Sequence, residues 1–485
     1  MVTAMENVQT IYGSVHGRIE NGMWVYRGIP FARAPEGELR FQPPVPPQPW
    51  PTVLDATRDG MRPWQKPAPW VTDADSHVYG EDCLNLNVWT PAADGKKRPV
   101  LVYFFGGGHF EGSNCEKGLI AQPLLKNQDC VMVTPNYRVG ALGYLYLAHL
   151  LGEKYADSGN LGLLDQIAAL KWVQENIHQF GGDPDQGTIM GQSAGAKAVA
   201  CLLASPLSQG LYRRAILMSG GLQCIKDVQT EKAQTSNFLQ AAGLQENEAA
   251  ALLSMSPEKI RDAQEKANNV YFKAESYGAT ADGLTIPVDF EKALMKRRLD
   301  GVDILMGHTL QELYLRPDAD KTPLSDAEMQ QRMQWKFGQN AQRVMEVYQE
   351  RLKSDGFEKA YGETMTEYTY VQAYQRTARL FAQCGAHVYL YSWDAPGAAV
   401  ASHTSDLETL FDMRKDIHPH AVNRLKDLFV HFIRTGSPQT DTLPLWEACS
   451  ENALPQMRLG DEAGVGMMTA QTLDPAFPLQ VMKLG

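Results

Sequence analysis

Residues 188–198 constrain the fold of this chain more than any other stretch. They read Thr-Ile-Met-Gly-Gln-Ser-Ala-Gly-Ala-Lys-Ala, and their centre, residues 191–195, has the spacing G-x-S-x-G. That spacing is typical of a sharp turn between a strand and a helix, where small residues let two backbones approach and a serine projects outward. The apolar run 187–190 predicts a short buried strand, and the alanine-rich run 194–204 predicts a helix. We therefore interpret Ser193 as a candidate nucleophile.

Three consecutive glycines, residues 106–108, form the second informative feature. They follow residues 99–105, a continuously apolar run that predicts a strand covered on both faces. A glycine triplet by itself can be a plain flexible turn. Here it lies after a predicted buried strand and upstream of the G-x-S-x-G turn, which favours a loop whose N–H groups stabilise a developing negative charge.

The remaining pattern predicts an α/β fold. Residues 130–136 read as another apolar strand, and residues 163–180 have apolar positions at helical spacing. Residues 181–184, Gly-Gly-Asp-Pro, predict a turn before the strand that leads to Ser193. This order of strand, loop, strand, helix, strand, turn and helix implies a sheet built largely of parallel strands.

Composition excludes some classes of function. The length of 485 residues would by itself suggest about three domains, but no composition shift marks a boundary. A net charge of −11 argues against nucleic acid as the main partner. No stretch is apolar enough to span a membrane, and the N-terminal residues 1–9 do not resemble a signal peptide. The seven scattered cysteines suit free thiols in a reducing compartment, so we expect a cytoplasmic protein.

In these features the chain resembles the type-B carboxylesterases, an α/β-hydrolase family that includes cholinesterases and bacterial para-nitrobenzyl esterases. The resemblance runs along essentially the whole chain, through segments 28–32, 39–41, 81–89, 106–108, 136–138, 160–166, 180–184, 191–195 and 434–438 with Trp446. It implies one α/β-hydrolase domain over residues 1–485, with a central, mostly parallel sheet, helices on both faces and helical cap insertions. The largely helical segment 314–383 is expected to contribute to that cap.

The resemblance also implies a catalytic triad. The acid of the family follows a strand and its glycine, which here are residues 302–306 and Gly307, so Glu312 matches it. The histidine matches His403, which precedes acidic residues by three and by five positions. The order Ser193, Glu312, His403 agrees with that of α/β-hydrolases.

The activity implied is hydrolysis of small-molecule carboxylic esters through an acyl-enzyme on Ser193, with no metal or cofactor and in a monomer or weak homo-oligomer. The expected oxyanion hole consists of backbone N–H groups from Gly107, Gly108 and Ala194.

Two departures from the family pattern concern the substrate pocket. Gln192 occupies the position of a glutamate, and the aromatic residue after the glycines is displaced, giving His109-Phe110. We expect these three residues to line the pocket. We also expect Gln192 to lie about 8 Å from His403, a distance at which a carboxylate at position 192 would favour the protonated imidazole through Coulomb attraction. Cys83, which is paired in secreted members of the family, has no partner cysteine near residues 61–64.

Other interpretations remain open at this stage. The same mechanism could act on amides, carbamates or lactones, and some relatives of this fold are binding proteins without activity. The presence of all three expected triad residues argues against a binding protein without activity. His418 and His420 could suggest metal ligation, but no accompanying cysteine or aspartate pattern supports it in the sequence.

Overall fold

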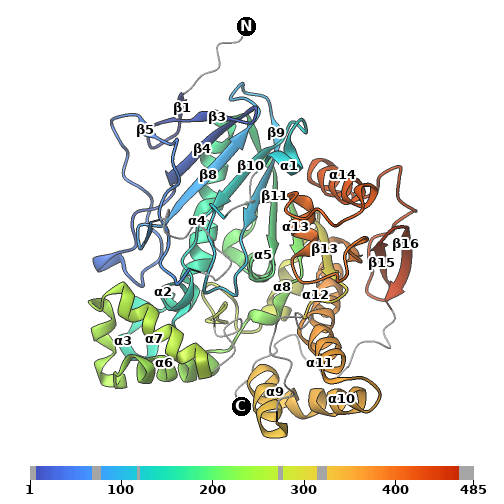
Figure 1. The fold of residues 1–485 in the computed structure, drawn as a ribbon. Coiled ribbons are helices and arrows are strands. Elements are labelled where there is room, and N and C mark those ends of the chain that lie inside the picture. The colour runs from blue at the N-terminus through green and yellow to red at the C-terminus, as the bar shows by residue number, and fades with distance from the viewer. Residues whose placement is uncertain (1–6, 68–77, 117–120, 271–276, 314–324, 469–485) are drawn as a thin grey trace.

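The fold is built on one large twisted sheet. The computed structural model describes residues 7–67, 78–116, 121–270, 277–313 and 325–468 (Figure 1). Eleven strands form the main sheet in the order β16-β15-β14-β13-β12-β11-β9-β10-β8-β4-β3. These strands are β3 (Arg18–Glu20), β4 (Met23–Pro30), β8 (Asn85–Thr90), β9 (Arg98–Phe104), β10 (Val131–Pro135), β11 (Gly182–Gln192), β12 (Arg214–Met218), β13 (Asp303–Thr309), β14 (His387–Trp393), β15 (Leu454–Leu459) and β16 (Ala463–Met468).

Strands β10, β9, β11, β12, β13, β14 and β15 pair in parallel, whereas β3, β4, β8 and β16 pair antiparallel at the two edges. The predicted mostly parallel sheet is thus confirmed. Two short sheets lie outside it, from β1 (Asn7–Gln9), β2 (Ser14–His16) and β5 (Leu54–Asp55), and from β6 (Arg62–Pro63) and β7 (Tyr79–Gly80).

One local prediction is wrong. Residues 181–184, expected to form a turn, instead contain the start of β11, which begins at Gly182. Gly182 pairs with Arg98, and the register then shifts before Gly187 pairs with Val100. The Gly-Asp-Pro sequence fits in β11 because residues 183–186 lie within this irregularity and are not paired regularly with β9. A proline there removes no hydrogen bond between the strands.

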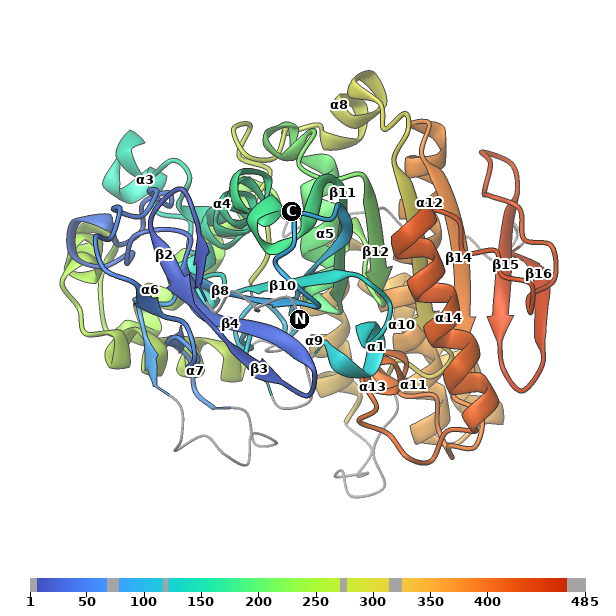
Figure 2. The same cartoon turned by 90° about the horizontal axis from the view of Figure 1, so that it is seen from above.

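Helices cover both faces of the sheet. Seen from above, α4, α5, α8 and α12 lie on one face, and α1 and α14 lie on the other (Figure 2). The helices are α1 (Gln122–Leu125), α2 (Gly140–Tyr144), α3 (Ala148–Leu151), α4 (Leu161–Asn176), α5 (Ala194–Ala204), α6 (Val228–Ala242), α7 (Pro257–Val270), α8 (Phe290–Arg297), α9 (Asp326–Phe337), α10 (Ala341–Ser354), α11 (Phe357–Thr366), α12 (Gln372–Gln383), α13 (Ser405–Leu410) and α14 (Pro419–Thr435).

The segment between β13 and β14 is helical in its described part. Helices α9, α10 and α11 gather at one end of the sheet (Figure 1), and residues 314–324 lie outside the described residues. The N–H of Leu313, four residues after β13, donates to the hydroxyl of Thr366 at the end of α11 at 3.0 Å. This bond joins the loop after β13 to the helical segment.

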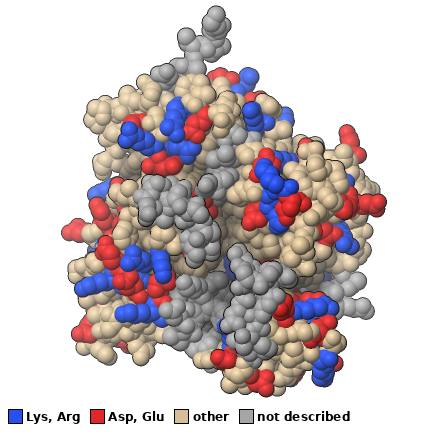
Figure 3. Space-filling model, in the orientation of Figure 1, with Lys and Arg blue, Asp and Glu red and all other residues tan. Residues whose placement is uncertain are grey.

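The surface carries charges of both signs. On the face drawn in Figure 3, Lys and Arg side chains are interspersed with Asp and Glu side chains. Among the described residues, no helix combines the length and the apolar character that crossing a membrane requires. All seven cysteines are free, including the buried Cys83.

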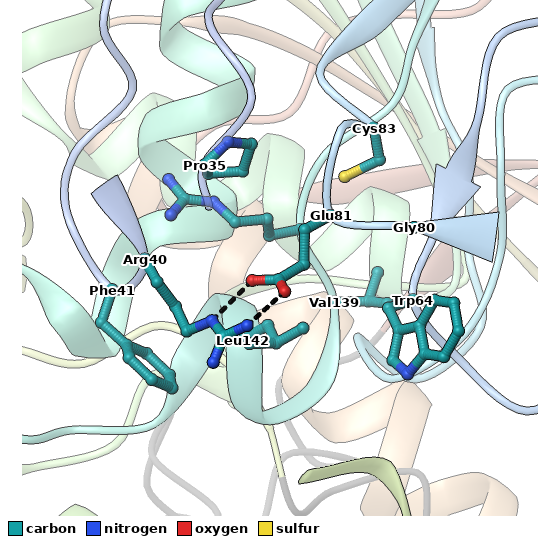
Figure 4. Close-up of a pocket in the computed structure, with 10 residues that line it drawn as sticks. Pro35, Arg40, Phe41, Trp64, Gly80, Glu81, Cys83, Val139 and Leu142 are labelled. Atoms are coloured by element: carbon teal, nitrogen blue, oxygen red, sulfur yellow. Dashed lines mark hydrogen bonds and ion pairs between the residues drawn. The ribbon is translucent and has the colours of Figure 1, made fainter. Parts of the chain in front are cut away.

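Two buried ion pairs fasten the loops around the sheet. Arg40 binds Glu81 through two nitrogens, at 2.7 and 2.5 Å, and donates to the carbonyl of Met255 at 2.6 Å (Figure 4). Arg138 binds Asp165 of α4 through Nε at 2.8 Å and a terminal nitrogen at 2.7 Å, and Asp165 also accepts the backbone N–H of Arg138 at 2.9 Å. The second pair fixes the chain between β10 and α2 against α4.

We expect the Arg138–Asp165 pair to contribute strongly to stability because neither partner can reach water when the other is removed. Asp165 is completely buried and Arg138 is 4 % exposed. Asp165→Asn should lower the free energy of unfolding by about 3 to 5 kcal/mol in urea titrations. Glu350→Gln, which removes an exposed partner of Lys353, is the control and should cost less than about 1 kcal/mol. A loss below about 1 kcal/mol for Asp165→Asn would contradict this account.

Candidate active site

Ser193 occupies a strained turn between β11 and α5. Its backbone has φ 56° and ψ −122°, outside the regions that L-residues favour. The turn requires glycine on either side, because a Cβ on Gly191 would overlap the carbonyl of Gly195, and a Cβ on Gly195 would overlap the carbonyl oxygen of Phe104. The N–H of Ser193 donates to Met218 O at 2.8 Å and anchors the turn to β12. The predicted helix over residues 194–204 is confirmed, since α5 has these bounds.

The glycine loop that follows β9 lies against this turn. A Cβ on Gly106 would come within 3.3 Å of the Ser193 Cβ, and Gly107 and Gly108 have φ values of +100° and +63°. Within the described residues, no acceptor binds the backbone N–H of Gly107, Gly108 or Ala194. Three donors near one serine can therefore bind a negatively charged oxygen without losing existing bonds.

Glu312 and His403 meet at the carboxyl ends of β13 and β14. Glu312 Oε2 lies 2.5 Å from His403 Nδ1, and the Glu312 side chain is fully buried. Gln311 pairs with Ser402 in an isolated parallel bridge, and the N–H of Ala401 donates to Gln311 Oε1 at 2.9 Å. These bonds hold the two loops in register, so residues 91 positions apart face each other.

Several groups stabilise the carboxylate of Glu312. The N–H of Thr309 donates to its Oε1 at 2.8 Å. Burial alone would raise the pKa of Glu312, but the charge and hydrogen bond of His403 and the nearby Ser219 hydroxyl outweigh it and lower the pKa below its usual value. Glu312 therefore stays ionised and fixes the proton of the imidazole on Nδ1, which leaves Nε2 as the basic nitrogen.

Gln192 is much closer to His403 than the sequence led us to expect. Its amide nitrogen lies 3.2 Å from His403 Nε2, so the expected separation of about 8 Å is wrong. The reason is that β11 extends through Gln192 to the turn itself, which points this side chain at the imidazole. Gln192 therefore contacts the imidazole of His403 directly.

His109 and Phe110 follow the glycine loop. His109 is buried against Tyr144, with the ring centroids 5.2 Å apart. Burial, and then the charges of Lys197 and Lys226, lower the pKa of His109 to about 3, so its imidazole is neutral at ordinary pH. Phe110 is half-buried. It packs against a hydrophobic cluster that is separate from the main core and contains Tyr144.

Two further residues lie near His403: Asp406, which the sequence analysis noted only as the acid three positions after the histidine, and Tyr370, which it missed. Asp406 is buried and accepts the hydroxyl of Tyr391 at 2.8 Å, and burial raises the pKa of Asp406 to about 6. Tyr370 lies in a π-helical turn, Glu367–Val371, between α11 and α12, and its ring centroid is 5.1 Å from that of His403. Such turns recur at functional sites, but no sequence signal marks this one.

His418 and His420 lie on the surface with Asp461. His418 Nδ1 is 2.6 Å and His420 Nε2 is 3.3 Å from Asp461 Oδ1. Of the described residues, these three form the one group of three His, Cys, Asp or Glu side chains close enough to share an ion. Asp461 is distant in the sequence, so the pattern around Pro419 could not reveal it. All three side chains are exposed, and their contacts are those of surface ion pairs.

The chain is similar to known proteins along most of its length. The carboxylesterase family matches residues 4–474. A para-nitrobenzyl esterase of Bacillus subtilis is 32% identical, covering 94% of this chain and 95% of that protein. A phenmedipham hydrolase of Pseudarthrobacter oxydans is 29% identical, with coverage of 93% and 94%.

Solved structures give the same result. The crystal structure of a Geobacillus stearothermophilus carboxylesterase superposes with a TM-score of 0.84 at 35% identity, covering 95% of this chain and 98% of that one. A thermophilic para-nitrobenzyl esterase superposes with a TM-score of 0.82 at 30% identity, with coverage of 95% and 97%. The chain therefore belongs to the carboxylesterase family, with its α/β-hydrolase fold, and is a carboxylic ester hydrolase of the serine hydrolase type.

Proposed function

We propose that this enzyme hydrolyses esters through a covalent acyl-enzyme on Ser193, with His403 as the base and Glu312 as the residue that orients it. The observation that carries the proposal is the 2.5 Å contact between Glu312 Oε2 and His403 Nδ1 beside the strained turn of Ser193. A buried carboxylate that holds one imidazole nitrogen leaves the other free to accept the serine proton.

Each step of the reaction has a group to perform it. His403 Nε2 accepts the proton as Ser193 Oγ attacks the ester carbonyl carbon. The N–H groups of Gly107, Gly108 and Ala194 stabilise the oxyanion, and one such donor is worth roughly 3 to 4 kcal/mol in enzymes of this type. His403 then protonates the leaving alcohol, and water activated by the same imidazole hydrolyses the acyl-enzyme.

Gln192 competes with Ser193 for the lone pair of His403. Its amide nitrogen is 3.2 Å from His403 Nε2, and a neutral imidazole nitrogen accepts one hydrogen bond. The amide leaves the imidazole uncharged, whereas a carboxylate at the same place would bind and favour the imidazolium, which cannot act as a base.

The first prediction concerns the nucleophile. Ser193→Ala should abolish labelling by a fluorophosphonate and lower kcat for a para-nitrophenyl ester by about four or more powers of ten. Ser205→Ala, at the opposite end of α5, is the matched control and should retain labelling. Labelling that persists in Ser193→Ala, or a peptide map that places the label on another serine, would refute the assignment.

The second prediction separates Glu312 from neighbouring acids. Glu312→Gln should lower kcat by about 10⁴-fold, since the imidazole loses the acceptor that fixes its tautomer, while circular dichroism stays that of the parent. Glu408→Gln and Asp406→Asn should be much milder, because Glu408 binds Thr404 and Asp406 binds Tyr391. Equal losses at all three positions would show that Glu312 has no special role.

The third prediction concerns Gln192. A carboxylate about 4 Å from the imidazole would be worth up to about 4 kcal/mol at an effective dielectric of 20. His403 is 24 % exposed, so solvent reduces this effect. We expect Gln192→Glu to move the acidic limb of the kcat/KM profile upward by about one pH unit and to improve turnover of a quaternary ammonium ester relative to a neutral one.

Gln192→Met, which removes the amide without adding charge, is the control for that shift and should leave the acidic limb within about 0.3 pH units of its original position. An acidic limb that stays in place or moves downward in Gln192→Glu contradicts an electrostatic role for residue 192.

A further inference from the structure

Two histidines and an aspartate converge at one point of the surface. His418 directly precedes α14, His420 lies in the first turn of that helix, and Asp461 lies in the turn between β15 and β16. His418 Nδ1 and His420 Nε2 face the same oxygen, Asp461 Oδ1, at 2.6 and 3.3 Å. These three atoms all lie within 4.8 Å of one another. A cation among them can therefore contact all three side chains.

The backbone holds the three residues in place before any ion binds. The N–H of His418 donates to the carbonyl of Pro396 at 2.8 Å. The guanidinium of Arg424, one turn further along α14, donates to the carbonyls of Gly460 and Asp461 at 2.9 and 3.2 Å. The turn that carries the aspartate is thus fastened to the helix that carries the histidines. Ligands positioned in this way lose less conformational entropy when they bind an ion.

The chemistry of the side chains selects the class of ion. Imidazole nitrogens together with a carboxylate suit Zn²⁺, Cu²⁺ or Ni²⁺, whereas Mg²⁺ and Ca²⁺ prefer oxygen ligands alone. In a tetrahedral zinc site with bonds of about 2.0 to 2.1 Å, the ligand atoms are about 3.3 Å apart. Each pair of ligand atoms here is within about 1.5 Å of that separation, so small side-chain rotations suffice.

Solvent can complete the coordination of such an ion. Asp461 also lines an open hollow of about 560 Å³, which Asp394, Pro396 and Arg458 border as well. Three protein ligands and one water form a common arrangement around zinc. Two positive charges lie nearby, but Arg458 pairs with Asp394 at 2.6 Å, and Arg424 is directed at backbone carbonyls.

We propose that His418, His420 and Asp461 bind one divalent transition-metal ion, with Zn²⁺ the best match, and that the ion stabilises the fold by joining the turn between β15 and β16 to α14. None of the three belongs to the proposed triad or to the glycine loop, so the inference does not rest on the proposed function. Their side chains are 49, 53 and 61 % exposed, and the site is therefore reached directly from solvent.

The test is calorimetric titration of the full chain, without a polyhistidine tag, with zinc chloride and with magnesium chloride. We expect one Zn²⁺ per chain with a dissociation constant of about 10 µM, weaker than in closed structural zinc sites, and no binding of Mg²⁺ here. His420→Asn and Asp461→Asn should each weaken zinc binding by about 100-fold or more, because even residues that only support a ligand contribute 10- to 100-fold. Zinc at about 100 times its dissociation constant should raise Tm by about 2 °C in the parent alone.

A matched control is available at another surface pair. His387 Nδ1 lies 2.9 Å from Asp303 Oδ1, and the same carboxylate is 3.9 Å from Arg214. This pair offers one imidazole and no second histidine, so His387→Asn should leave the affinity for zinc unchanged.

The variants also separate this site from the free thiols, which can bind zinc elsewhere in the chain. Zinc affinity within about twofold of the parent in both His420→Asn and Asp461→Asn overturns the proposal, as does a parent that binds no zinc at about 1 mM. An equal loss in His387→Asn overturns it too. Esterase activity is not a readout, so failure of the proposed function leaves this result unaffected.

Discussion

The strained backbone of Ser193 is the constraint on which the rest of the site depends. A residue at φ 56° and ψ −122° stays there only when its surroundings force it to. Here β11 on one side, α5 on the other, and the near contacts of Gly191 and Gly195 supply that force. Because Gly195 also touches the end of β9, the same packing that fixes the turn brings the glycine loop beside the serine.

The parallel sheet converts distant segments into one site. Strands β11, β12, β13 and β14 are neighbours and run the same way, so their carboxyl ends and the loops after them share one edge. Glu312 and His403 are each placed by a loop after one of these strands, and the bridge between Gln311 and Ser402 keeps the loops aligned. The chemistry of the site therefore depends on strand order as much as on the residues themselves.

Sequence reasoning reached the parts of the site that are encoded locally. The turn around Ser193, the helix after it and the glycine loop each follow from neighbouring residues, whereas Glu312 and His403 needed a resemblance to known esterases. The contact of Gln192 with His403 and the burial of Asp406 could not be predicted, because each depends on which segments meet in space. The start of β11 was missed because Gly-Asp-Pro predicts a turn unless a partner strand is known to lie alongside.

The most direct test of this account is a crystal structure of the enzyme inactivated by an alkyl fluorophosphonate. We predict a covalent bond from Ser193 Oγ to phosphorus, with the phosphoryl oxygen within about 3 Å of the N–H groups of Gly107, Gly108 and Ala194. The Gln192 amide should have moved away from His403 Nε2. Phosphorus on another residue, or a phosphoryl oxygen that none of these three donors contacts, would contradict the assignment of the site.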